Sequence, residues 1–99
     1  QFTLSNKAKD DLHQISIFSK IRLDNEKCIS LIKQFDDTFH LLADIPLAGT
    51  VCDDLKPGCL KYALYKHFIY YQQSEGGKVE ILRILHKSFA PPSSFEASR

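Results

Sequence analysis

The chain has 99 residues, of which 43% are hydrophobic and 25% are charged, a composition typical of one small globular domain. Thirteen basic and twelve acidic side chains leave a net charge of +1, too balanced for a protein that depends on non-specific contacts with nucleic acid phosphates. No stretch approaches the ~20 apolar residues of a membrane helix, and the first residues lack a signal-peptide pattern, so we expect a cytoplasmic protein.

The first half predicts a short strand followed by a helical hairpin. Residues 2–4 are long enough for an edge strand, and Ser5 is suited to cap the helix that follows. Asp24 is suited to cap a second helix, which should end near Asp44 because Pro46 disfavours helical geometry before it. Apolar residues at helical spacing define the faces expected to be buried: Ala8, Leu12, Ile15 and Phe18, widened by Ile17 and Ile21, in the first helix, and Cys28, Leu31, Ile32, Phe35, Phe39 and Leu42 in the second.

The second half changes to strand periodicity after a connecting loop over residues 44–58. We expect strands over residues 60–65, 67–71 and 79–85. The last two should pair antiparallel through the hairpin loop 74–77, which contains two glycines. Apolar runs without alternation are typical of central strands that are covered on both faces.

These elements predict an α+β fold in the order β-α-α-β-β-β, with a helical hairpin packed on one face of a small, mainly antiparallel sheet. We expect a single domain over residues 1–88 and a mobile tail over residues 89–99, where prolines and serines break regular structure. The hairpin covers one face of the sheet, so the other face should expose an apolar patch that a partner could cover.

The three cysteines predict neither a disulfide framework nor a zinc site, because no two of them have CxxC spacing. Cys28 lies on the apolar face of the second helix and should be buried there. Cys52 and Cys59 flank a loop and could approach one another. No motif indicates a metal or a cofactor.

Basic residues are concentrated in the second half. Residues 56–87 contain six basic and two acidic side chains, a net charge of +4. This part of the chain is where we expect an acidic partner to bind.

Several blocks of residues in a fixed order carry a resemblance to a known family. They are Leu4-Ser5-x-x-Ala8-x-x-Asp11-Leu12, then Gln34-Phe35-x-x-x-Phe39-x-Leu41-Leu42-Ala43-x-x-Pro46-x-x-Gly49, then Asp53-x-Leu55-Lys56-Pro57-Gly58, His67-Phe68-Ile69-Tyr70-Tyr71 and Arg83-Ile84-Leu85-His86. Across residues 2–88 the chain resembles the ParE branch of the RelE/ParE toxin superfamily. It departs from the family where an Arg followed by an aromatic and a Pro-x-Gly turn are usual, since Leu60, Tyr62, Ala63 and Tyr65 occupy these places.

The resemblance implies the toxin of a type II toxin–antitoxin system, which inhibits DNA gyrase by stabilising its cleaved-DNA state and so blocks replication. It also implies a ParD-like antitoxin with a segment that folds as it binds, giving a hetero-oligomer. DNA would be met only within the gyrase complex. Neither catalysis, a cofactor nor a membrane is implied.

Two alternatives remain open, a ribosome-dependent mRNA endonuclease of the RelE branch and a decayed toxin that only binds its antitoxin. RNA cleavage requires groups that move protons together with cations on the phosphate, and the candidates are Lys61, Lys66, His67, Arg83 and His86. Alternation along the last strand should point Arg83 and His86 to opposite sides, which argues against their convergence. With the small net charge, this favours the inhibitor.

The residues expected to contact partners are Lys61, Lys66, Tyr70, Arg83, His86 and Lys87. Arg83 is costly to bury unpaired in an apolar strand. We expect it to reach solvent on the open face of the sheet, or to pair there with a carboxylate that the antitoxin could supply.

Overall fold

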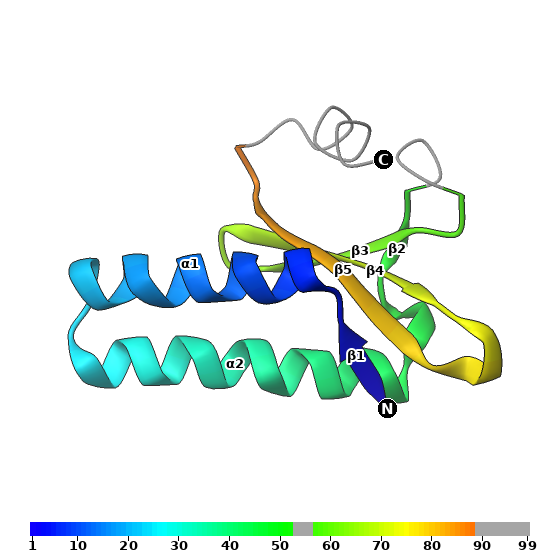
Figure 1. Cartoon of the computed structure of the whole chain (residues 1–99), viewed down its shortest axis with the longest axis horizontal. Coiled ribbons are helices and arrows are strands. Elements are labelled where there is room, and N and C mark those ends of the chain that lie inside the picture. The colour runs from blue at the N-terminus through cyan, green and yellow to red at the C-terminus, as the bar shows by residue number, and fades with distance from the viewer. Residues whose placement is uncertain (53–56, 89–99) are drawn as a thin grey trace.

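The computed structural model describes residues 1–52 and 57–88, which form two helices packed on a five-stranded mixed sheet (Figure 1). The elements are β1 (Phe2–Leu4), α1 (Asn6–Arg22), α2 (Asn25–Asp44), the 3-10 turn η1 (Pro46–Ala48), β2 (Thr50–Val51), β3 (Leu60–Leu64), β4 (His67–Gln73), the 3-10 turn η2 (Glu75–Gly77) and β5 (Val79–His86). The strand order is β1-β5-β4-β3-β2. Only β1 and β5 pair in parallel, and the other neighbours are antiparallel. The predicted α+β fold class is confirmed.

Both helices begin at the predicted caps. The Ser5 Oγ accepts a hydrogen bond from the Ala8 N–H at 3.0 Å, and the Asp24 carboxylate accepts one from the Lys27 N–H at 2.8 Å. In α2 the predicted apolar face is confirmed, with Phe35, among others, completely buried. Within the described residues, none of the helices is long and apolar enough to cross a membrane.

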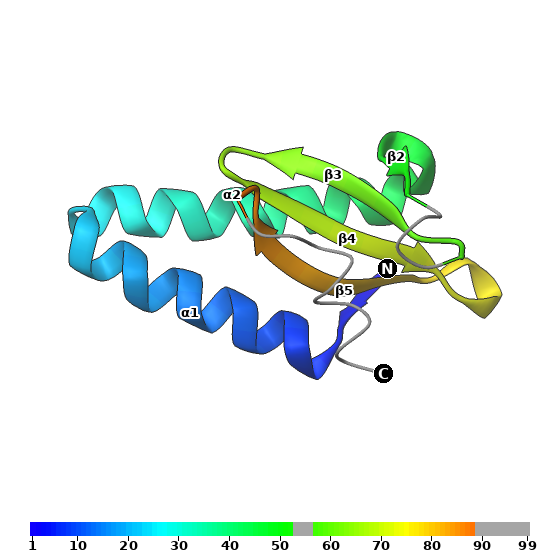
Figure 2. The same ribbon diagram turned by 90° about the horizontal axis from the view of Figure 1, so that it is seen from above.

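The predicted buried face of α1 is wrong at its C-terminal end. Ala8 is buried, but Ile17, Phe18 and Ile21 are 42%, 58% and 75% exposed. The hairpin extends past the strands, so the last turns of α1 have no sheet to pack against (Figures 1 and 2).

The main core lies between the hairpin and the inner face of the sheet, and its buried residues are Ala8, Phe35, Phe39, Leu42, Leu60, Ile69, Tyr71, Val79, Ile81 and Ile84. The hydroxyl of Tyr71 donates to the Pro46 carbonyl at 2.9 Å and accepts from the Gly49 N–H at 2.8 Å. A Cβ on residue 49 would collide with this hydroxyl, so the contact requires glycine. It fixes the chain between α2 and β2.

The outer face of the sheet differs from the open apolar face that we expected. Tyr70 and Leu85 are 1% and 5% exposed there, and they form a second small core with Cys52 and Cys59. The predicted loop 44–58 contains the edge strand β2, which places these two cysteines beside the outer face. The open-face prediction is therefore wrong for Tyr70 and Leu85. The predicted tail over residues 89–99 lies outside the described residues.

Candidate interaction sites

Two lysines converge on one phenylalanine on the outer face of the sheet. The Nζ of Lys61, on β3, lies 4.6 Å from the ring centroid of Phe68, and the Nζ of Lys87, just after β5, lies 5.3 Å from it. Each ammonium group is attracted to the ring by a cation–π interaction. We call Lys61, Phe68 and Lys87 the outer basic site.

Two more of the predicted contact residues lie beside this site. The Lys87 N–H donates to the Lys66 carbonyl at 2.8 Å, which ties the exposed β3–β4 turn to the end of β5. Tyr70 is next to Phe68 on the same face, with ring centroids 6.2 Å apart, but only 1% of it is exposed. Its ring therefore supports the site from beneath and presents almost no surface to a partner.

Arg83 has a partner within its own chain, contrary to the expectation that it faces solvent or an antitoxin carboxylate. Its Nε and Nη2 donate to the two carboxylate oxygens of Asp11, on α1, at 2.8 and 3.1 Å. Asp11 raises the pKa of Arg83 through these hydrogen bonds, against the opposing effect of burial. The same carboxylate accepts from the Ile84 N–H at 3.0 Å.

The sequence missed this contact because β1 is so short. β1 pairs with β5 only from Val79 to Ile81, which leaves the rest of that edge of β5 without a neighbouring strand. The chain turns into α1 there, and side chains make the hydrogen bonds that a neighbouring strand would have made. The Ser5 Oγ donates to the Leu82 carbonyl at 2.8 Å, and the Asp11 carboxylate accepts from the Ile84 N–H.

Arg83 and His86 line one hollow, although the strand register between them is regular, as the prediction from alternation requires. The bulge in β5 lies before Arg83, since Tyr70 pairs with Arg83 but Tyr71 pairs with Ile81, and the pairing from Arg83 to His86 is regular. Arg83 lines the hollow because its side chain extends to Asp11 on α1. The hollow has a volume of about 410 Å³, and its lining residues are Asp11, Gln14, Ile15, His67, Arg83, Ile84, Leu85 and His86.

His67 and His86 lie directly opposite each other in this hollow, with ring centroids 5.3 Å apart. Burial, and to a lesser extent His86, lower the pKa of His67 below 6.5. Because the Ser88 N–H donates to Nδ1 of His86, neutral His86 carries its proton on Nε2. Asp11 balances the charge of Arg83, so the hollow is close to neutral when both imidazoles are neutral.

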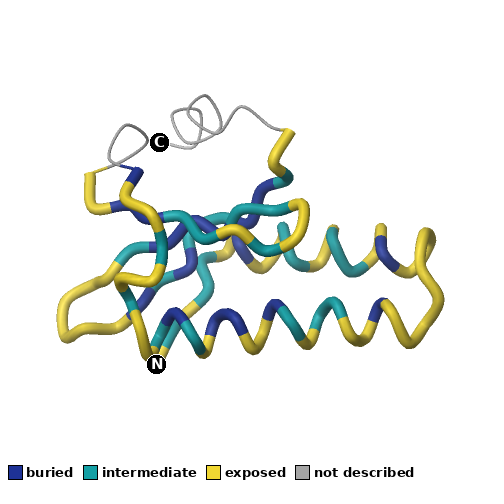
Figure 3. The backbone as a smooth tube through the Cα atoms, turned by 180° about the vertical axis from the view of Figure 1, so that it is seen from behind, coloured by how far each residue is buried: buried dark blue, intermediate teal, exposed yellow. Residues whose placement is uncertain are grey.

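A third surface lies at the end of the hairpin and includes Ile17, Phe18 and Ile21, which the sequence pattern had assigned to a buried face. Ile17, Phe18, Ile21, Leu23 and Ile29 are all exposed there. Figure 3 shows this end of the molecule largely exposed. The width of the apolar stripe on α1, too broad for one neighbour, is the signal that could have found it.

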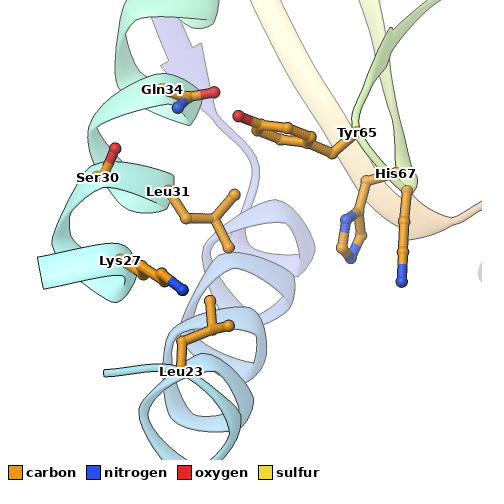
Figure 4. A pocket seen from close by; sticks show the side chains of 8 residues that line it. Leu23, Lys27, Ser30, Leu31, Gln34, Tyr65 and His67 are labelled. Atoms are coloured by element: carbon orange, nitrogen blue, oxygen red, sulfur yellow. The ribbon is translucent and has the colours of Figure 1, made fainter. Parts of the chain in front are cut away.

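This surface adjoins a groove of about 440 Å³ between α2 and the β3–β4 turn, which we call the hairpin groove. Its lining residues are Leu23, Lys27, Ser30, Leu31, Gln34, Tyr65, Lys66 and His67. Figure 4 shows Tyr65 reaching from the turn toward Gln34, with Leu31 and Leu23 along the floor. Its charged lining residues, Lys27 and Lys66, are both cationic.

A model of the ParE toxin of the type II toxin–antitoxin system parDE matches residues 2–91. The chain belongs to the ParE toxin family. It is 31% identical over 87 residues to Toxin ParE1 of Caulobacter vibrioides, covering 88% of each chain. It is 23% identical over 87 residues to Toxin ParE1 of Mycobacterium tuberculosis, covering 88% of this chain and 89% of that one.

A solved chain of a chromosomal ParDE TA system from P. aeruginosa has the same fold. Its TM-score is 0.73 at 19% identity, and the match covers 87% of this chain and 94% of that chain. The fold and the ParE assignment inferred from sequence motifs are thus confirmed. In the described part of the chain, no group of three or more His, Cys, Asp or Glu residues could hold a metal ion.

Proposed function

We propose that this ParE toxin inhibits DNA gyrase in the cytoplasm and so blocks DNA replication, and that a ParD-like antitoxin neutralises it. The observation that carries the proposal is the family match, which extends from residue 2 to residue 91. The toxin acts by binding and not by catalysis.

The arrangement of most candidate catalytic groups supports binding over RNA cleavage, the exception being Lys66, which lines the hairpin groove with His67. A nuclease must bring cations and proton-transfer groups to one phosphate. The outer basic site and the His67–His86 pair lie on opposite faces of the sheet, because Phe68 and His67 are consecutive residues of one strand. Arg83, which does share the hollow with the histidines, is already neutralised by Asp11.

The two lysines of the outer basic site are the proposed contact with gyrase. They carry part of the net charge of +4 in residues 56–87. Attraction to an acidic protein surface, or to the DNA held in the gyrase complex, would orient the toxin on its target.

The antitoxin segment is proposed to dock at the hairpin groove and the exposed apolar end beside it. Exposed apolar side chains favour a partner with an apolar face. The Arg22 guanidinium, 4.7 Å from the centroid of Phe18, together with Lys27 and Lys66 favours acidic residues around that face. One end of the hairpin would thus receive the antitoxin, and the outer face of the sheet would meet gyrase.

One experiment separates the inhibitor from the nuclease. The purified toxin is incubated with gyrase and supercoiled plasmid, and in parallel with translating ribosomes. We expect cleaved plasmid to accumulate only when gyrase and toxin are both present, and mRNA to stay intact. Ribosome-dependent mRNA cleavage with normal gyrase activity would overturn the proposal. An antitoxin-binding protein that affects neither reaction would indicate a decayed toxin.

A further inference from the structure

Cys52 and Cys59 are directly opposite each other across the edge of the sheet. β2 and β3 pair Thr50 with Lys61 and Val51 with Leu60, and one more step of this register pairs Cys52 with Cys59. The Cys52 N–H donates to the Cys59 carbonyl at 2.9 Å, which confirms that the step is made.

The two side chains also point to the same side. Directly opposite residues of an antiparallel pair project from the same face, and both cysteines belong to the outer core with Tyr70 and Leu85. Opposite residues of a hydrogen-bonded pair have Cα atoms about 5.5 Å apart, close to the commonest separation in disulfides. Both side chains are thiols in the structure.

Access for a small oxidant comes from the position of this pair at the sheet edge. β2 has only two residues and is the outermost strand of the sheet. Opening such a short edge strand exposes the thiols at a lower free energy than unfolding the whole domain. Cys52 is 5% exposed and Cys59 is completely buried, so Cys52 is reached first.

We propose that Cys52 and Cys59 form an oxidation site that closes to a reversible cross-strand disulfide. Hydrogen peroxide converts the Cys52 thiolate to a sulfenic acid and releases hydroxide. The Cys59 thiol attacks this sulfur, the S–S bond forms, and the sulfenic oxygen leaves as water. In total, two thiols and one peroxide give one disulfide and two waters. The bond fastens β2 to β3 beside the outer basic site.

The third cysteine is an internal control. Cys28 is 3% exposed, about as buried as the pair, but it lies on α2 with its Sγ 3.9 Å from the Ser16 carbonyl oxygen. No cysteine lies opposite it, so burial alone cannot make it react like the pair.

The test uses the full chain under native conditions with a small excess of hydrogen peroxide. We expect the thiol titre to fall from three to one, the mass to fall by about two units for the lost hydrogens, and dithiothreitol to restore both. Cleavage before Asp53 separates the two cysteines, so an unreduced digest should contain the peptide of Cys52 linked to that of Cys59. Alkylated Cys28 should appear in a separate peptide.

Variants keep the test independent of any one substitution. Cys28→Ala should still form the disulfide, whereas Cys52→Ala and Cys59→Ala should each prevent it. Linkage through Cys28, disulfide-linked dimers in place of the internal bond, or three intact thiols after treatment that oxidises glutathione would overturn the proposal. Because these measurements involve no gyrase and no antitoxin, they stand apart from the test of the proposed function.

Discussion

His67 should make the free energy of unfolding of the protein depend on pH. Burial lowers its pKa from 6.5, and the neighbouring His86 lowers it further. A histidine of this kind binds its proton more readily in the unfolded chain, so stability is lost as the pH falls through the unfolded pKa. We expect the free energy of unfolding to decrease from about pH 7 to about pH 5, and His67→Gln to remove part of this decrease.

Urea unfolding at the two pH values measures the effect. The control is His13→Gln, because His13 is exposed on α1. An identical pH dependence in the wild type and His67→Gln would show that the hollow does not disfavour the imidazolium.

At the scale of elements, α1 forms hydrogen bonds with the edge of β5 that a longer β1 would otherwise have paired with. Asp11 joins the helix to the strand by three hydrogen bonds, two from the Arg83 guanidinium and one from the Ile84 N–H. Asp11→Ala leaves a mostly buried cation and a backbone N–H without their acceptor. We expect a loss of about 1–3 kcal/mol in the free energy of unfolding.

Denaturant unfolding tests this prediction, with Asp10→Ala as the matched control. Asp10 is the exposed neighbour on the same helix, and its removal should change stability by less than about 0.5 kcal/mol. Equal effects of the two substitutions would contradict a joining role for Asp11.

The elements also show where sequence patterns suffice and where they do not. The periodicity of α2 predicted its buried face because that helix packs against α1 near Cys28 and against the core of the sheet from Phe35 onward. It failed for Phe18, because a helical period does not reveal where the opposing sheet ends. Alternation correctly separated Arg83 from His86 along β5. It did not reveal that the Arg83 side chain meets the Asp11 carboxylate where β5 has no neighbouring strand. Register, which placed Cys52 against Cys59, emerges only once β2 is known.

At the scale of the whole molecule, the proposed gyrase contact and the proposed antitoxin contact can be removed separately. Lys61→Glu with Lys87→Glu reverses the charge of the outer basic site. We expect this variant to lose gyrase inhibition but still bind the antitoxin. Plasmid cleavage by gyrase measures the first property and a pull-down with the cognate antitoxin the second. Lys9→Glu with Lys33→Glu, at exposed positions of α1 and α2, is the charge-matched control. If the Lys61→Glu, Lys87→Glu variant still inhibited gyrase normally, the gyrase contact would lie elsewhere.

Ile21→Asp at the hairpin end should have the opposite effect, which is to weaken antitoxin binding while gyrase inhibition is retained. Ile21 is 75% exposed, so the fold should tolerate the change, while an antitoxin docked there would lose at least about tenfold in affinity. Titration with the cognate antitoxin measures the loss. Leu47→Asp is the control, because Leu47 is 77% exposed near β2, away from the groove. Equal losses of affinity for both variants would argue against the hairpin groove and its apolar end as the antitoxin site.

The overhang of the hairpin has a thermodynamic consequence for whatever binds it. From Ile17 to Lys27 only Ser19 is buried, so few apolar contacts oppose local opening of these turns. Their amide hydrogens should therefore exchange with solvent sooner than those of the central strand β4. A ligand that binds this end must restrict the motion of the overhang, and this ordering reduces the net free energy of binding. Mutations that rigidify the overhang could thus tighten the complex without adding a single contact to it.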